Sequence, residues 1–278
     1  MQAARAPRFT IRPDRRQATL IALLLVLAAL GWVVTDDRMA GMDHGPGTDL
    51  GSLGFYVTAW VVMMAAMMFP SIAPMVAVYQ RVQWKRREQG RALRGATALF
   101  VAGYIACWAA FGLAAYGLFA LARSLDIEAL GWDEAGPYVA GGMLVAAAAY
   151  QLTPLKDACL SRCCSPLGFV ITNWRGGRVG AVVMGVKHGA WCVGCCWALM
   201  ASLFALGVMS VGWMVFVAAL IAVEKLLPWK GVANRGVAVL LLVLGLAVAF
   251  VPEGVPGLTI PHEAQGMDHG KMHETMSP

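Results

Sequence analysis

The stretch from Leu53 to Val78 reads LGFYVTAWVVMMAAMMFPSIAPMVAV and contains no charged residue. An α-helix needs about 17–25 apolar residues to cross the hydrocarbon core of a bilayer, and this stretch meets that length. Its apolar residues do not alternate with polar ones, so the pattern does not fit a strand of a membrane β-barrel. Because a backbone in lipid must satisfy its own hydrogen bonds, the stretch predicts a transmembrane α-helix.

Six further apolar segments accompany it. They are Ala18–Val34, Ala96–Ala122, Pro137–Leu152, Val179–Val208, Val211–Leu227 and Gly236–Val251. Only 14% of the 278 residues are charged, against about a quarter in an ordinary soluble domain. We therefore expect an all-α polytopic membrane protein, a bundle of about seven transmembrane helices. The alternative for the first segment is a signal peptide, but its predominantly apolar run of 17 residues exceeds the usual length of about 7–15.

The basic residues are distributed unevenly among the connections between these segments. If the connections are counted alternately from the N-terminus, one set carries 18 of the 22 Lys and Arg residues. Lys and Arg concentrate on the cytoplasmic side of membrane proteins. This predicts a multi-pass membrane protein, with its N-terminus in the cytoplasm and its C-terminus outside. The net charge of +6 then reports topology, and we expect membrane lipid but no nucleic acid as a partner.

These patterns divide the chain into three regions. We expect a basic cytoplasmic N-terminus at 1–17, a transmembrane helical domain at 18–251, and a disordered outer tail rich in His and Met at 252–278. Low hydrophobicity and many small polar residues are typical of disordered segments.

One short repeat falls on the predicted outer side. The sequence GMDHG occurs at 41–45 and again at 266–270. Thioether and imidazole groups together suit copper. The candidate outer ligands are Met42, His44, Met267 and His269. The alternative is chance repetition in a low-complexity segment.

Four methionines form two overlapping M-x-x-x-M pairs in the stretch quoted first. Met63 and Met67 are four residues apart, as are Met64 and Met68, so each pair shares a helix face. Thioethers are soft ligands for Cu(I), although methionine also fills irregular cores. Packing and metal ligation both remain open for this stripe.

The fifth apolar segment carries the most informative cluster. At 100° per residue, His188, Cys192 and Cys195 fall within about a 60° arc of a helix, and Cys196 lies beside them. Nitrogen and sulfur ligands on one face suit Cu(I) or Zn(II), and an ionisable residue inside a membrane is a candidate functional residue. We expect this cluster to bind copper as Cu(I), with zinc as the second choice; packing and redox chemistry are the alternatives.

A third cluster, Cys159 and Cys163, follows the fourth segment on the predicted cytoplasmic side. At about 1.5 Å per residue, the methionine and cysteine clusters both fall near the middle of a roughly 30 Å core, so we expect the two spans to meet there. Cys159 and Cys163 would exchange the ion with the cytoplasm, unless they are incidental thiols. All seven cysteines lie in the membrane or on the cytoplasmic side, where thiols stay reduced, so we expect no disulfide framework.

Three motifs carry a resemblance to a known family. They are MAAMMFP at 64–70, PLKDACL at 154–160 and CVGCCWALM at 192–200. On these motifs the chain resembles a bacterial family of unknown function that is catalogued as predicted metal-binding integral membrane proteins. The resemblance implies a metal-binding membrane protein and implies no particular substrate.

Together these patterns favour a membrane protein that binds Cu(I) and transports or transfers it, with a metallochaperone or metalloenzyme as its partner. A non-enzymatic role is the preferred interpretation. The enzymatic alternative is a membrane thiol–disulfide oxidoreductase that uses Cys192 and Cys195, which have C-x-x-C spacing. A further alternative is an accessory membrane subunit whose metal is structural.

Overall fold

The computed structural model describes residues 14–39, 52–90, 93–124, 136–207, 210–227 and 229–255. All regular secondary structure in these ranges is helical, as the sequence predicts. The helices are α1 (Arg15–Met39), α2 (Leu53–Glu88), α3 (Ala96–Ser124), α4 (Gly136–Gln151), α5 (Pro154–Cys163), α6 (Pro166–Asn173), α7 (Gly177–Leu206), α8 (Val211–Leu226), α9 (Lys230–Phe250) and the 3-10 helix η2 (Pro252–Gly254). The candidate outer ligands Met42, His44, Met267 and His269 lie outside the described residues.

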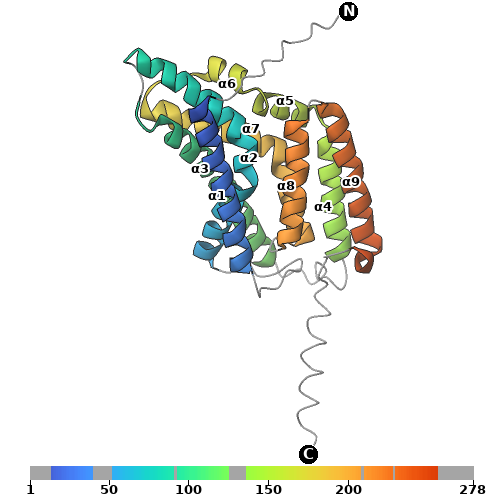
Figure 1. Cartoon of the computed structure of the whole chain (residues 1–278). Coiled ribbons are helices and arrows are strands. Elements are labelled where there is room, and N and C mark those ends of the chain that lie inside the picture. The colour runs from blue at the N-terminus through green and yellow to red at the C-terminus, as the bar shows by residue number, and fades with distance from the viewer. Residues whose placement is uncertain are drawn as a thin grey trace, which may run out of the picture.

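Helices α1, α2, α3, α7 and α9 are each long and apolar enough to cross a membrane, and they are the five such helices among the described residues. Helices α4 and α8 have 16 residues each, which corresponds to about 24 Å at the rise of an α-helix. Both nevertheless run beside longer helices, α4 against α9 and α8 against α2 and α9 (Figure 1).

Two short helices occupy the connection between α4 and α7, to which the sequence analysis assigned no helix. Each begins with a proline, Pro154 in α5 and Pro166 in α6. Proline suits the first helical turn, where an N–H group would have no partner. The hydroxyl of Thr153 caps α5 by accepting a hydrogen bond from the Lys156 amide at 3.3 Å. Both short helices lie at the end of the bundle where α1 begins (Figure 1).

Glycines allow α3 and α7 to pack with their backbones in contact. A methyl group at Gly185 would lie 2.0 Å from the carbonyl oxygen of Phe100, and one at Gly103 would lie 2.3 Å from that of Val182. Small residues let membrane helices approach this closely. The contact fixes α7, which carries the cysteines, against α3.

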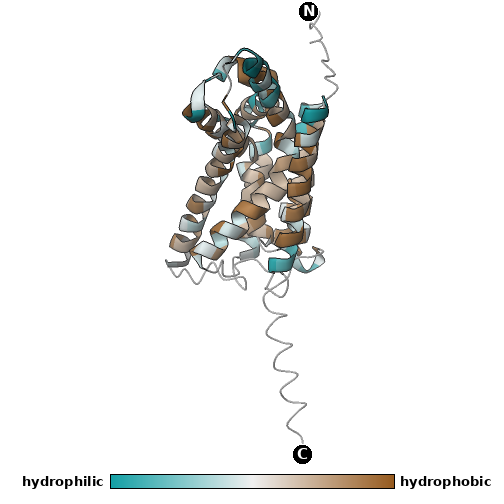
Figure 2. Cartoon of the chain, turned by 60° about the vertical axis from the view of Figure 1, so that its left-hand side comes forward, coloured by the Kyte–Doolittle hydropathy of each residue, from teal (hydrophilic) through white to brown (hydrophobic). Residues whose placement is uncertain are grey.

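The two ends of the bundle differ in polarity. Hydrophilic residues gather at the end that holds α5 and α6, whereas apolar residues cover the lengths of the helices (Figure 2). Basic residues follow the same division. The helix ends and connections there carry Arg15, Arg16, Arg81, Lys85, Arg86, Arg87, Arg94, Arg162, Arg175, Arg178 and Lys230, whereas the opposite end carries Arg38 among the residues whose side chains the structure describes.

Candidate metal site

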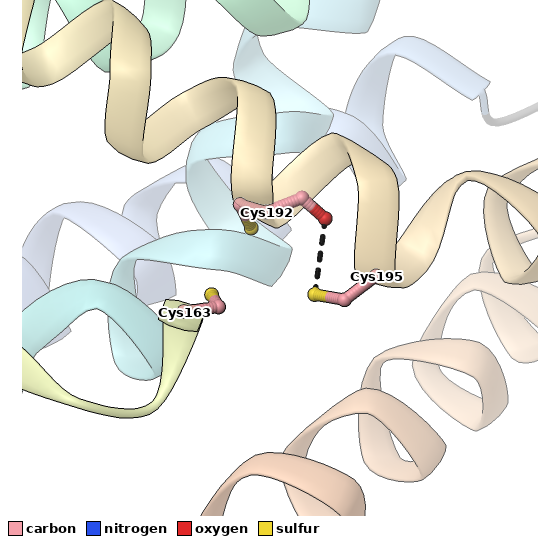
Figure 3. Close-up of side chains that lie close together, drawn as sticks. All are labelled: Cys163, Cys192 and Cys195. Carbon is pink, nitrogen blue, oxygen red and sulfur yellow. Dashed lines mark hydrogen bonds between the residues drawn. The ribbon is translucent and has the colours of Figure 1, made fainter. Parts of the chain in front are cut away.

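Three cysteine side chains from two helices turn towards one another (Figure 3). Cys163 ends α5, and Cys192 and Cys195 lie about one turn apart on α7. The Sγ atoms of all three lie within 4.8 Å of one another, and each residue is at most 8% exposed. The Cys195 thiol donates to the carbonyl oxygen of Cys192 at 3.1 Å. Among the described residues, this is the one group of three or more His, Cys, Asp or Glu side chains whose ligand atoms lie so close.

The spacing of these sulfur atoms fits a three-coordinate metal site. With metal–sulfur bonds of about 2.3 Å, a trigonal site separates its sulfur atoms by about 4.0 Å, which is within the 4.8 Å observed. Cys196 adds a further sulfur, because its Sγ atom lies 3.3 Å from that of Cys195. The cluster therefore offers three or four soft donors, the kind that select Cu(I) or zinc.

Two polar side chains from neighbouring helices contact Cys192. The Lys225 ammonium group on α8 donates to Cys192 Sγ at 3.1 Å, and the Tyr104 hydroxyl on α3 lies 3.1 Å from the same sulfur. A cation at this distance attracts the negative charge of a metal-binding thiolate. The sequence analysis included Lys225 in the apolar segment Val211–Leu227 and did not name it as a candidate site residue. The available signal was the adjacent charged pair Glu224 and Lys225 near the end of an otherwise apolar segment.

His188 lies on the buried face of α7 but outside the sulfur cluster. It is 2% exposed, and its ring lies 5.2–6.1 Å, between centroids, from the rings of Phe100, Tyr104 and Phe169. Its Nδ1 atom has no hydrogen-bond partner among the described residues, which is uncommon for a buried polar atom. As the helical spacing in the sequence indicates, His188 lies on the same buried side of α7 as the cysteines. It is not, however, one of the three residues of the close group. The third member of the close group is Cys163, which α5 brings to α7.

The methionine stripe of α2 approaches the cluster indirectly. The stripe comprises Met63, Met64, Met67 and Met68, all at most 4% exposed and all in the same hydrophobic core as the cysteines. The Ser71 hydroxyl lies 3.9 Å from Met68 Sδ, and it accepts a hydrogen bond from Lys225 at 3.3 Å. One end of the stripe is thus connected to Cys192 through Ser71 and Lys225.

Two contacts hold α5 in position. A methyl group at Gly194 would lie 2.9 Å from Cys159 Sγ, so α5 rests on the α7 backbone at this glycine. The Lys156 ammonium group donates to Glu224 on α8 at 2.7 Å, and both side chains are at most 1% exposed. Separating a buried ion pair leaves uncompensated charges, so this contact strongly fixes α5. Burial raises the pKa of the Cys159 thiol, which keeps that thiol neutral near pH 7.

Comparison with known protein families identifies the family of this chain. The family model PpoB2, described as a copper chaperone, matches residues 57–248. The chain belongs to this family. The PpoB2 region includes all seven cysteines and confirms the metal-binding family that the three sequence motifs implied. No curated protein and no solved structure matches the chain. PpoB2 membership and the buried cysteine cluster together indicate copper binding.

Proposed function

We propose that this chain is a multi-pass protein of the bacterial inner membrane that binds Cu(I) at Cys163, Cys192 and Cys195 and transfers it to a protein partner. The observation that supports this most directly is the approach of three buried sulfur atoms from α5 and α7 to within 4.8 Å. Thiolates are soft ligands that favour Cu(I), and a site for transfer must also release its ion. A site assembled from two helices can release the ion when α5 moves. The partner is a metallochaperone or a copper enzyme.

The proposed topology has seven spans, formed by α4 and α8 together with the five longer helices. Both shorter helices run between the same two ends as their neighbours (Figure 1). The basic end, which holds α5 and α6, then faces the cytoplasm. Residues 1–17 form the basic cytoplasmic segment, 18–251 the membrane domain, and 252–278 the outer tail.

The ion path that we propose uses the remaining soft residues. The outer segments with Met42, His44, Met267 and His269 collect copper, and the α2 methionines lead it to the cysteines. Burial of the methionine stripe in the core shared with the cysteines supports this path. The Nδ1 atom of His188, which has no hydrogen-bond partner among the described residues, and the Cys159 sulfur, once metal binding releases its proton, provide further ligand atoms beside the cluster.

Copper content and X-ray absorption of the purified protein test the site. We expect a single Cu(I) site with a sulfur shell, and a clear loss of copper in Cys163→Ser. Cys164→Ser is a matched control, because Cys164 follows directly in the chain, is half-buried and is outside the cluster. Equal loss in the two variants, or a shell without sulfur, would contradict the proposal.

The contact between Lys225 and Cys192 also supports a second candidate, a thiol–disulfide oxidoreductase that uses Cys192 and Cys195. Reactive cysteines lie near cations, but they also need access to a substrate, and Cys192 is only 1% exposed. Thiol trapping in cells separates the candidates: a Cys192–Cys195 disulfide that forms and disappears with redox conditions supports the enzyme. A structural metal, in contrast, would not exchange with an added copper isotope.

A further inference from the structure

Lys225 places a positive charge at the edge of the sulfur cluster. Its Nζ atom lies 3.1 Å from Cys192 Sγ and 3.3 Å from the Ser71 hydroxyl. In the described part of the chain, Lys225 forms no ion pair with a carboxylate. The adjacent Glu224 is instead bound to Lys156 at 2.7 Å. The ammonium charge of Lys225 is therefore directed at the metal-binding sulfur atoms.

We propose that Lys225 is a positioning residue that makes this site select monovalent soft ions over divalent ones. This inference rests on the proposed copper function and adds to it the basis of metal selectivity. Thiolates alone do not provide that basis, because they bind Zn(II) as well as Cu(I). A group that responds to the charge of the ion is needed as well.

The repulsion between Lys225 and a bound ion increases in proportion to the charge of the ion. An ion about 2.3 Å from Cys192 Sγ lies at most about 5.4 Å from Nζ, given the 3.1 Å contact between Nζ and the sulfur. At an effective dielectric constant of about 20, one additional unit of charge at this distance weakens binding by about two orders of magnitude. The close group contains three cysteines and no carboxylate that would offset the repulsion.

Lys187 offers a matched control for the charge. It lies on α7 one residue before His188, its side chain is exposed, and its ammonium group donates to Asn173 at 3.4 Å. Removing this lysine changes the net charge of the chain by the same amount as removing Lys225. It leaves the contacts of Cys192 intact.

Binding of Ag(I) and Zn(II) to the purified full-length protein tests the inference. Ag(I) serves as a monovalent soft ion that stays in one oxidation state, and chelators of known affinity set the free ion concentrations. Lys225→Met should raise the affinity for Zn(II) relative to that for Ag(I) by about 10- to 100-fold. Lys225→Arg keeps the charge and should keep the wild-type ratio, as should Lys187→Met.

An unchanged ratio in Lys225→Met, or a parallel loss of both ions, would overturn the selectivity role. If Lys225→Met does not fold, Lys225→Gln removes the same charge, retains a donor for Ser71 and should raise the ratio in the same way. If the wild-type protein binds Ag(I) but Lys225→Met and Lys225→Gln leave the ratio of Zn(II) to Ag(I) affinity unchanged, only the role of Lys225 is refuted. Wild-type protein that does not bind Ag(I) through its cysteines refutes the copper site itself.

Discussion

The methionine stripe of α2 and the cysteines of α7 are similar in sequence, since both place soft side chains at helical spacing, but they differ in the structure. All four methionines are buried against the core from a single helix. On α7, two thiols meet a third thiol from α5, and Lys225 and Tyr104 both contact Cys192. Spacing along one helix therefore identifies a buried face. A candidate site additionally requires a second element that brings ligands and charge to that face.

Among the substitutions that test this comparison, replacing Cys192 should have the largest effect on metal binding. Cys192→Ser removes the sulfur that belongs to the close group and contacts both Lys225 and Tyr104. Because even outer-shell changes weaken metal sites by about 10–100-fold, we expect loss of a ligand to weaken Ag(I) binding by more than about 100-fold. Competition titration of the purified protein measures this change. Retained affinity would show that the cysteines of α7 are core residues like the methionines.

Breaking the ion pair that holds α5 should have the second-largest effect, on both protein stability and metal binding. Lys156→Met leaves Glu224 buried without its partner, so we expect a loss of about 3–5 kcal/mol in the free energy of unfolding and weaker Ag(I) binding because Cys163 is less well placed. Denaturation of the detergent-solubilised protein measures the first effect. The double variant Lys156→Met with Glu224→Gln removes both charges and should recover much of the stability. If it recovers none, the pair does not act through its charges.

A methyl group between α5 and α7 should have a smaller effect. Gly194→Ala would place Cβ 2.9 Å from Cys159 Sγ, and overpacking of this kind costs about 1–3 kcal/mol. We expect α5 to shift away from α7, with Ag(I) affinity reduced by about tenfold. Gly142→Ala is the control, because among the described residues no atom beyond its own stretch of helix lies within 4 Å of the added methyl group. Equal affinities in the two variants would show that the α5–α7 distance does not limit binding.

The smallest effect should come from the methionine stripe. Met63→Leu with Met67→Leu conserves volume, and each such exchange usually costs less than about 1.5 kcal/mol. We expect the copper content of the purified protein to be unchanged, whereas the rate of copper loading should fall if the stripe conducts the ion. A fall in equilibrium copper content would place these thioethers in the binding site and remove the distinction between the two regions.

The sequence was sufficient for the long helices. Apolar length predicted α7 at 179–208, and the helix spans Gly177–Leu206. Apolar length also predicted a helix from Leu53 to Val78, whereas α2 continues to Glu88. Its last turn contains Lys85, Arg86 and Arg87, and basic side chains stabilise the C-terminal end of a helix. Hydropathy reports the part of a helix inside lipid and does not report such an extension.

The complete candidate site could not be predicted in the same way. Helical spacing indicates which residues share the buried face of α7, but Cys163 reaches that face only because α5 folds back onto Gly194. Lys225 reaches Cys192 only because α8 packs beside α7. Both contacts join residues that are distant in the chain. They follow from tertiary packing, which local sequence patterns do not specify.

The glycine contacts between α3 and α7 also limit how an ion can enter and leave. Carbonyl oxygens of one helix lie where a methyl group would be on the other, so these two helices cannot slide or rotate past each other without separating. The ten-residue helix α5, which carries Cys163, is held instead by side-chain contacts, the Lys156–Glu224 ion pair with α8 and the packing of Cys159 on Gly194 of α7. Copper exchange should therefore depend on local displacement of a short helix at the basic end, and not on the rocking of two bundle halves that many transporters use.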